Sequence, residues 1–213
     1  MTAGARTHVI ARLSPDGFRD SVRGLAGLLA DAVDGNASVG FLAPFGHDEA
    51  VAWWAAQQPA VDDGSLTVWA ARGPSGITGA FGLARSPKPN SRHRAELVKL
   101  MVHRDARGQG LGRALLATAE EAAARAGATL LLLDTETGSP AEHLYRAAGW
   151  TRYGVVPDYA GDPAGTLKDC SFYFKRLTPT HPAPDPATAT AGSAATGRGG
   201  HCPETVGGAE AGA

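Results

Sequence analysis

The residues that point most directly to chemistry form the turn Arg107 to Arg113, which reads Arg-Gly-Gln-Gly-Leu-Gly-Arg. Its alternating glycines remove the side chains that would keep a ligand from the backbone, so several N–H groups can converge on one anion. A helical pattern begins within the turn, and the N-terminus of a helix favours negative charge. With Arg104 nearby as a further cation, the turn predicts a site for a multiply charged anion, most simply a diphosphate.

The turn lies between a predicted strand and a predicted helix. The apolar residues from Leu97 to Val102 fall on both alternating faces, which is typical of a strand covered on both sides of its sheet. Leu111 to Ala126 repeat apolar and small residues at helical spacing, and Ala128 to Leu133 indicate a second buried strand. The turn Asp134 to Gly138 is expected to close that strand.

Other segments are expected to complete the sheet and its helices. Ser14 and Ser139 each precede a proline at the first position of a predicted helix, and Glu142 follows Ser139 at capping-box spacing. Another helix is expected from about Asp48. The remaining strands are predicted at residues 7–13, 65–71, 77–84, 152–156 and 171–177, with a loop at residues 157–169.

Length and composition predict one folded domain and a tail. The chain has 213 residues and carries a formal net charge of -1, which argues against a nucleic-acid partner. From Thr178 onward it consists mostly of Pro, Ala, Thr and Gly, which cannot build a core. We therefore expect a domain at residues 1–177 and a disordered tail at residues 178–213. No apolar run suggests a signal peptide or a membrane span, so a cytoplasmic location is expected.

No metal site is predicted. The 2 cysteines, Cys170 and Cys202, are too few and too far apart for a CxxC pair or a disulfide framework. The histidines show no metal-ligand spacing.

The glycine turn and a later helix resemble a known superfamily. The pattern Arg107-x-x-Gly110-x-Gly112 is similar to the acyl-CoA pyrophosphate loop of the GNAT N-acyltransferases, and the helix from Ala141 to Trp150 is similar to their Ala-x-x-x-Tyr-x-x-x-Gly-Phe helix. Gly138 stands where the family often has Asn. The resemblance implies acetyl-CoA as co-substrate, bound by backbone groups of Met101 and Val102 and by the turn residues Arg107, Gly108, Gln109, Gly110, Leu111, Gly112 and Arg113.

A closer resemblance extends from about His93 to Leu177 and includes the segments AELVKLMV, ARGQGLGR and LLDTETGSPAE. These segments are similar to the tabtoxin-resistance acetyltransferases, bacterial enzymes that acetylate an amino-acid-like toxin. The resemblance implies that the substrate is a primary amine of a small metabolite or antibiotic. It also implies a single mixed α/β domain, with a mostly antiparallel sheet flanked by helices and splayed between its central strands to admit acetyl-CoA.

The resemblance also implies catalytic residues. An amine attacks a thioester only when it is neutral, yet a lysine-like amine has a pKa of about 10.4, so a base is needed. Glu96 and Asp134 match active-site carboxylates, which would bind the ammonium and take its proton. Tyr145 matches the tyrosine near the cofactor sulfur and would act as the acid for the departing thiolate.

Parts of the sequence also fit other classes of protein. Asp134 lies about twenty residues beyond the glycine turn, as in a dinucleotide-binding fingerprint, but Arg113 occupies the position of the third fingerprint glycine. No Lys-Ser or Lys-Thr follows the turn, which excludes a P-loop. Acetylation of a protein N-terminus or lysine, and a non-catalytic acyl-CoA sensor, stay open. The apolar loop Val39 to Phe45 and Trp53 could enclose a small-molecule pocket. A monomer or homodimer is expected.

Overall fold

The structure is a computed structural model in which residues 8–178 are described. The predicted boundary between domain and tail falls at the end of this range. Residues 179–213 of the predicted tail lie outside the described residues.

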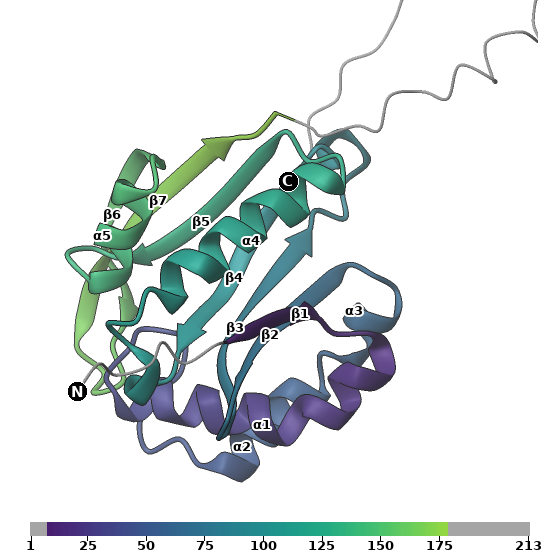
Figure 1. The fold of residues 1–213 in the computed structure, drawn as a ribbon. Coiled ribbons are helices and arrows are strands. Elements are labelled where there is room, and N and C mark those ends of the chain that lie inside the picture. Colours follow the sequence, from purple (N-terminus) through teal and green to yellow (C-terminus); the bar gives the residue numbers. More distant parts are fainter. Residues whose placement is uncertain (1–7, 179–213) are drawn as a thin grey trace, which may run out of the picture. The chain divides into compact units, whose positions relative to one another are not determined.

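The described residues form one mixed sheet of 7 strands in the order β1-β2-β3-β4-β5-β7-β6 (Figure 1). Every neighbouring pair is antiparallel except β4 and β5, which are parallel. The strands are β1 (Val9–Arg12), β2 (Leu66–Gly73), β3 (Gly76–Arg85), β4 (Arg94–Val102), β5 (Leu130–Glu136), β6 (Thr151–Gly161) and β7 (Leu167–Arg176).

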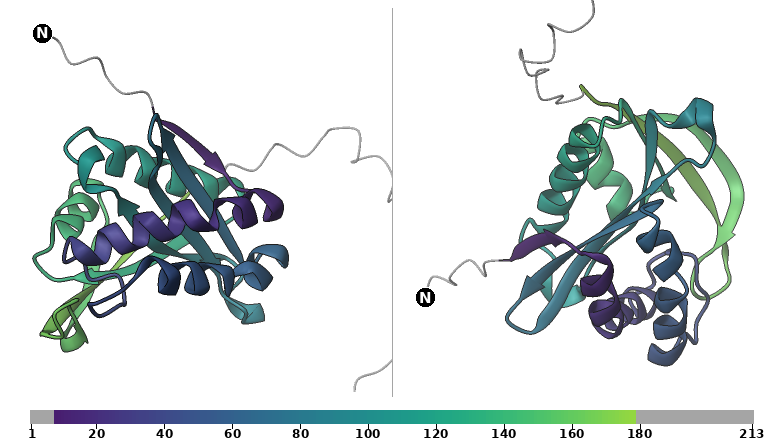
Figure 2. Two further views of the ribbon diagram at one scale, coloured as in Figure 1. Left: turned by 90° about the horizontal axis from the view of Figure 1, so that it is seen from below. Right: turned by 90° about the vertical axis from the view of Figure 1, so that its right-hand side faces the viewer.

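Helices pack on both faces of the sheet. The helices are α1 (Pro15–Asp34), α2 (His47–Ala55), α3 (Gln58–Asp62), α4 (Leu111–Arg125) and α5 (Pro140–Ala147), with the 3-10 turns η1 (Pro89–Ser91) and η2 (Arg104–Ala106). On one face α4 and α5 pack in a core that includes Leu115, Leu131 and Tyr173. On the other face α1 and α2 lie side by side in a core with Val68 and Ala80 of β2 and β3 (Figure 2).

The parallel strands β4 and β5 pair only where they begin. The last of their register pairs joins Glu96 to Leu132, and beyond it the strands separate. A β-bulge in β4 accompanies the separation: Phe81 of β3 alone lies opposite both Lys99 and Leu100, and Lys99 has φ +51°. Because a bulge bends and twists its strand, the sheet opens between β4 and β5. This is the opening that was expected between the central strands.

Most elements match the sequence predictions. Ser14 caps α1 by accepting a hydrogen bond from the Gly17 N–H, and Gly35 ends the helix. Ser139 caps α5 by accepting from the Glu142 N–H, whereas the Glu142 carboxylate bonds the N–H of Gly138. The predicted fold class, a mixed and mostly antiparallel sheet flanked by helices, is confirmed.

Two predictions about the C-terminal strands were wrong. The predicted loop at residues 157–169 is mostly strand, because β6 and β7 form one long hairpin that turns between Asp162 and Thr166. Pro157 is tolerated since β6 is an edge strand with an irregular register between Val156 and Ala160. The strand β5 also continues to Glu136 through its pairing with β7.

Candidate active site

Glu96 and Asp134 lie near the point where β4 and β5 separate, on the sheet face opposite α4. Glu96 pairs with Leu132, and Asp134 is two residues further along β5. Since side chains alternate along a strand, and Leu131 and Leu133 pack in the α4 core, Leu132 and Asp134 point to the opposite face. The two predicted carboxylates are therefore brought together.

The environment of Glu96 suits a general base. Burial, and then the negative charge of Asp134, raise the pKa of Glu96, while Arg94 and Lys99 act in the opposite direction. A carboxylate with a raised pKa holds a proton more firmly and is therefore a stronger base near neutral pH. The pair can thus attract a cation, and Glu96 can take a proton from it.

Lys99 lies near the two carboxylates, although it was not predicted to be a site residue. Its pKa is lowered by burial, against the attraction of Asp134 and Glu96. The bulge accounts for its position: Val98 and Lys99 break the alternation, so Leu100 returns to the α4 face while Lys99 reaches toward α2. We call Glu96, Lys99 and Asp134 the carboxylate site. A lone lysine within an otherwise apolar predicted strand was the signal available in the sequence.

The loop between α1 and α2 forms an aromatic wall beside Lys99. The Lys99 Nζ donates a hydrogen bond to the Val39 carbonyl at 2.7 Å. The same nitrogen lies 5.4 Å from the ring centre of Phe41 and 5.3 Å from that of Trp53, which are cation–π distances. Phe45 packs on Phe41 with ring centres 4.4 Å apart. The predicted wall of Val39 to Phe45 and Trp53 thus adjoins the carboxylate site.

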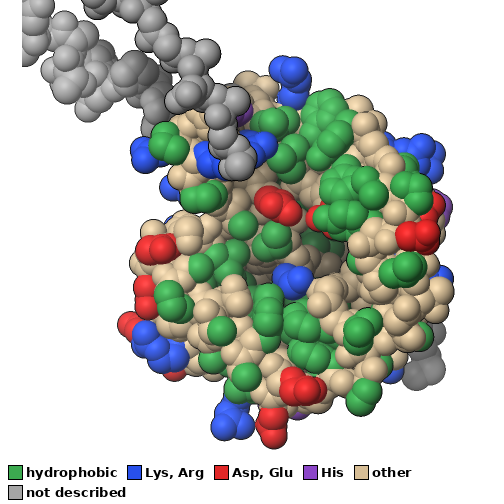
Figure 3. All heavy atoms as spheres, turned by 180° about the vertical axis from the view of Figure 1, so that it is seen from behind, with side chains coloured by type: hydrophobic (Ala, Val, Ile, Leu, Met, Phe, Trp, Pro, Cys, Tyr) green, Lys and Arg blue, Asp and Glu red, His purple; other side chains and the backbone are tan. Residues whose placement is uncertain are grey.

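The face with the carboxylate site is hollowed. Figure 3 shows this face from behind: acidic and basic side chains lie close together at the hollow, and hydrophobic side chains surround it. Aromatic residues of the β6–β7 hairpin share the face of Asp134, among them Phe172, which packs against Tyr153 and Tyr159. A small charged molecule could therefore bind between polar groups at the centre and apolar groups around them.

Cys170 contacts Asp134 from the neighbouring strand. Its Sγ donates to Oδ2 of Asp134 at 3.4 Å. Burial and the adjacent carboxylate raise the pKa of Cys170 to about 12, so the thiol keeps its proton and stays a donor. This contact was not predicted, because the register between β5 and β7 could not be read from the sequence.

Tyr145 lies on α5, in the core on the same side of the sheet as α4. The side chain is 6% exposed and packs near Trp150 and Tyr173, with ring centres 5.9 and 6.5 Å away. Burial, and then the charge of Asp134, raise its pKa well above the usual range. Its hydroxyl makes no hydrogen bond to another described residue. Tyr145 is thus a protonated donor close to Asp134.

The glycine turn has the backbone conformation that an anion site needs. Gly108 has φ +73° and Gly110, the N-cap of α4, has φ +80°, both in the left-handed region that favours glycine. A Cβ at Gly110 would meet no atom within 4 Å, so the turn is open on that side. Gly112, the second residue of α4, lies beside Val102, whose Cγ2 would be 3.8 Å from an added Cβ. The turn therefore sits next to the end of β4.

The arginines near the turn differ in their contacts. Arg113 is exposed and forms no ion pair within residues 8–178, and Arg107 donates from Nε to the Val102 carbonyl at 3.2 Å. Arg104 instead pairs with Asp31 of α1 through its side chain and its backbone N–H. Arg104 was expected to add charge for the anion, but Asp31 neutralises it. Gln109 also stays within the turn region, with its amide donating to the Asp105 carbonyl.

Beyond the bulge, the backbone N–H and C=O groups of successive β4 residues point alternately toward β3 and toward the opening. The His103 N–H donates to the Thr78 carbonyl of β3, and Met101 pairs with Ala80. In an antiparallel ladder successive residues alternate, so the polar backbone groups of Val102 face away from β3, toward the opening. Those of Met101 face β3. Of the two residues predicted to hold a ligand through the backbone, Val102 has the suitable orientation, and by the same alternation so has Leu100.

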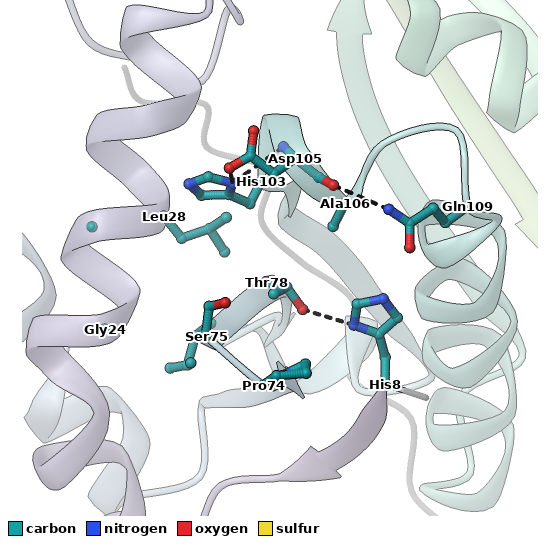
Figure 4. Close-up of a pocket in the computed structure, with 13 residues that line it drawn as sticks. His8, Gly24, Leu28, Pro74, Ser75, Thr78, His103, Asp105, Ala106 and Gln109 are labelled. Carbon is teal, nitrogen blue, oxygen red and sulfur yellow. Dashed lines mark hydrogen bonds and ion pairs between the residues drawn. The ribbon is translucent and has the colours of Figure 1, made fainter. Parts of the chain in front are cut away.

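A cavity that is separate from the carboxylate site lies beside the glycine turn. It has a volume of about 350 Å³ and is lined by α1, by the tip of the β2–β3 hairpin and by η2 (Figure 4). His8 and Thr78 form a hydrogen bond of 3.0 Å at its edge, and Gln109 reaches it from the turn. None of Glu96, Asp134 and Tyr145 lines this cavity. It is therefore not the site where the predicted catalytic groups meet.

Between residues 8 and 178 there is no group of three or more His, Cys, Asp or Glu side chains that could hold a metal ion. None of the helices in that part of the chain is long and apolar enough to cross a membrane.

Solved structures resemble this fold over most of the chain. An acetyltransferase from Salmonella typhimurium, solved with its cofactor acetyl-CoA, is 22% identical, with a TM-score of 0.63 over 84% of this chain and 98% of that chain. A ribosomal-protein-alanine N-acetyltransferase from Brucella melitensis is 25% identical, with a TM-score of 0.63 over 79% of this chain and 99% of that chain. A phosphinothricin N-acetyltransferase is 15% identical, with a TM-score of 0.66 over 80% and 99% of the respective chains.

The sequence itself matches a family over its central part. Residues 33–150 match the acetyltransferase (GNAT) family. This range runs from the end of α1 to Trp150, and it includes the opened strands, the glycine turn, both carboxylates and Tyr145. The chain therefore belongs to the acetyltransferase (GNAT) family.

Proposed function

We propose that the protein transfers the acetyl group of acetyl-CoA to the primary amine of a small, amino-acid-like metabolite or antibiotic. The observation that carries this proposal is the meeting of Glu96 and Asp134 at the opening between β4 and β5, with Tyr145 close to Asp134. The pyrophosphate of acetyl-CoA would bind at the glycine turn, and its pantetheine arm would enter the opening along Val102. Detoxification or self-resistance is the proposed setting, as in the tabtoxin-resistance enzymes that the sequence resembles.

The carboxylate site would prepare the amine. An ammonium binds between Glu96 and Asp134, and Glu96 takes one of its protons, directly or through water. The neutral nitrogen then attacks the thioester carbonyl carbon, whose developing oxyanion can accept hydrogen bonds from backbone N–H groups of β4 beyond the bulge. The C–S bond breaks and the CoA thiolate leaves. The products are the amide, CoA and one released proton.

Tyr145 would act on the leaving thiolate mainly as a hydrogen-bond donor. A thiol has a pKa of about 8.5, whereas that of Tyr145 is raised by burial, so complete proton transfer from the phenol would be uphill. A charge-assisted hydrogen bond from the phenol still stabilises the thiolate as the C–S bond breaks. The sulfur can then take its proton from the solvent or from the reaction intermediate.

A protein acceptor is the second candidate, because the Brucella melitensis structure is a ribosomal-protein-alanine N-acetyltransferase. A peptide would need an open groove. Here the loop that follows α1 is tied to β4 by the Lys99 bond and to the β6–β7 hairpin by the Ala43 N–H, which donates to the Pro163 carbonyl at 2.7 Å. This wall favours a compact acceptor over an extended one.

A release assay tests the proposed function. The full chain is incubated with acetyl-CoA and a panel of free amino acids, amine antibiotics, and peptides with N-terminal alanine or internal lysine, and free CoA thiol is measured. Release with at least one small amine and none with the peptides is expected. Release with peptides alone would contradict the small-molecule proposal, and no binding of acetyl-CoA in calorimetry would contradict the acyltransferase proposal itself.

Gly110→Ala tests the proposed cofactor turn. A residue with a Cβ at φ +80° costs roughly 1–2 kcal/mol, so the turn is expected to shift and the dissociation constant of acetyl-CoA to rise about tenfold. Gly127→Ala is the matched control, because Gly127 has φ +83° at the other end of α4 and its added Cβ would also meet nothing within 4 Å. Calorimetry should show weaker binding for Gly110→Ala alone. Equal affinities would place the pyrophosphate elsewhere.

A further inference from the structure

Lys99 is a charged residue that the proposed reaction does not use. It stands in β4 among apolar neighbours, and it adopts φ +51°, which costs free energy for a residue with a Cβ. The bulge turns its side chain to the face that carries Glu96 and Asp134, toward the wall formed by Phe41 and Trp53. The fold thus places one partly buried cation near two carboxylates.

The ammonium of Lys99 is only partly satisfied by the described residues. It has three N–H donors, and the structure gives one acceptor, the Val39 carbonyl at 2.7 Å. The rings of Phe41 and Trp53 attract the charge but accept no conventional hydrogen bond. No carboxylate among the described residues lies within the 4.0 Å of an ion pair with Lys99.

Glu96 and Asp134 nevertheless act on Lys99 through space. Both attract its charge, against the burial that disfavours it, so the three groups share one region although Lys99 forms no ion pair with either carboxylate. A polar group held partly out of water is costly unless it finds a partner. A ligand that fits this region would offer a cation to the carboxylates and an anion to Lys99.

We propose that Lys99 binds an anionic group of the acceptor, a carboxylate in the simplest case, and thereby selects zwitterionic acceptors over simple amines. This inference rests on the proposed function, because it places the amine of the acceptor at Glu96 and Asp134. The acceptor carboxylate accepts hydrogen bonds from the Lys99 Nζ, while Val39, Phe41 and Trp53 hold that nitrogen in place. Lys99 is then a residue for specificity and takes no part in the proton transfers.

The test compares matched acceptors. Amino acids that are acetylated in the release assay are compared with the corresponding amino amides and with the amines that lack the carboxyl group. A charge-assisted hydrogen bond of ordinary strength corresponds to about a 10- to 100-fold preference in kcat/KM for the acid. Equal use of acids and amides by the unaltered protein would overturn the proposal.

Variants can distinguish the effect of the Lys99 charge from the effect of its packing against the wall. Lys99→Met keeps an unbranched side chain only one atom shorter and removes the charge, so the preference for the acid should fall to near unity, mostly through KM. Lys99→Arg should keep a measurable preference. Phe41→Leu removes a wall residue but leaves the charge, so it should lower kcat/KM for acid and amide alike. An equal loss on both acceptors in Lys99→Met would assign Lys99 a purely structural role.

Failure of this inference can be told apart from failure of the proposed function. If acids and amides are both acetylated without a preference, the acetyltransferase proposal stands and the role of Lys99 falls. If acetyl-CoA does not bind, or if only peptides are acetylated, the small-amine proposal falls first. Melting temperatures of the variants would show whether a lost activity reflects a lost fold.

Discussion

Glu96→Gln is expected to lower kcat by roughly 10²- to 10⁴-fold, the usual effect of removing a general base. The amide has the size of the carboxylate but cannot take a proton, so the bound amine would stay charged and unreactive. Binding of acetyl-CoA, which is proposed to lie along the opening and the glycine turn, should change little. Steady-state kinetics together with calorimetry would separate the two effects. A variant with nearly full kcat would show that the base is another group.

The pH dependence follows from the raised pKa of Glu96. In the unaltered protein kcat/KM should fall as the pH drops through this pKa, which lies above the ordinary carboxyl value because of burial and Asp134. Asp134→Asn removes the repulsion and should move this acidic limb to lower pH. Lys99→Met removes an attraction and should move it to higher pH. Shifts in the opposite directions would contradict the assignment of the limb to Glu96.

Stability provides the control for Glu96→Gln. A carboxyl whose pKa is raised on folding binds its proton more tightly in the folded state, so it favours folding below its unfolded pKa and opposes folding once it is ionised. Replacing Glu96 with a neutral amide should therefore not lower the melting temperature at neutral pH. Loss of activity without loss of stability is the expected signature of a functional residue.

Local sequence signals predicted the glycine turn and the elements around it. The glycines of the turn, the serine-proline caps of α1 and α5 and the apolar spacing of β4 and α4 each depend on residues close together in the chain. Such signals give the type and approximate ends of each element. The positions of Glu96 and Asp134 at the ends of predicted strands came from the same information, together with the family resemblance.

The contacts of the site could not be predicted, because they depend on register between distant segments. Cys170 lies beside Asp134 only because β7 pairs with β5. The full length of the β6–β7 hairpin was not predicted, because a proline such as Pro157 normally argues against a strand. Asp31 neutralises Arg104 from a helix 73 residues away in the sequence.

The position of Lys99 has a different cause. Regular alternation along β4 would have turned this side chain into the α4 core, where a lysine could not be buried without a partner. The bulge opposite Phe81 resolves that conflict by moving Lys99 to the face of Glu96. The same bulge bends β4 away from β5. One irregularity thus opens the sheet between β4 and β5 and places a cation near the carboxylates, and strand periodicity alone contains no sign of it.

Tyr145→Phe is expected to lower kcat roughly 10- to 100-fold, which corresponds to the loss of one hydrogen bond to a charged thiolate. The change removes only the hydroxyl, and that hydroxyl has no hydrogen-bond partner among residues 8–178, so folding should be unaffected. The affinity for acetyl-CoA should also be nearly unchanged, because the bond forms only as the thiolate departs. Single-turnover measurements would place the loss in the chemical step.

Tyr173→Phe is the matched control for this variant. Tyr173 is also buried and lies 6.5 Å from Tyr145 between ring centres, but its hydroxyl donates to the buried carboxylate of Glu142 at 2.7 Å. Losing that bond leaves a buried acceptor less satisfied and should cost about 1–3 kcal/mol of stability, with little effect on kcat. The two variants are therefore expected to show opposite profiles in thermal melts and kinetics. Equal losses of kcat in both would mean that Tyr145 acts through packing, since neither hydroxyl would then be special to the reaction.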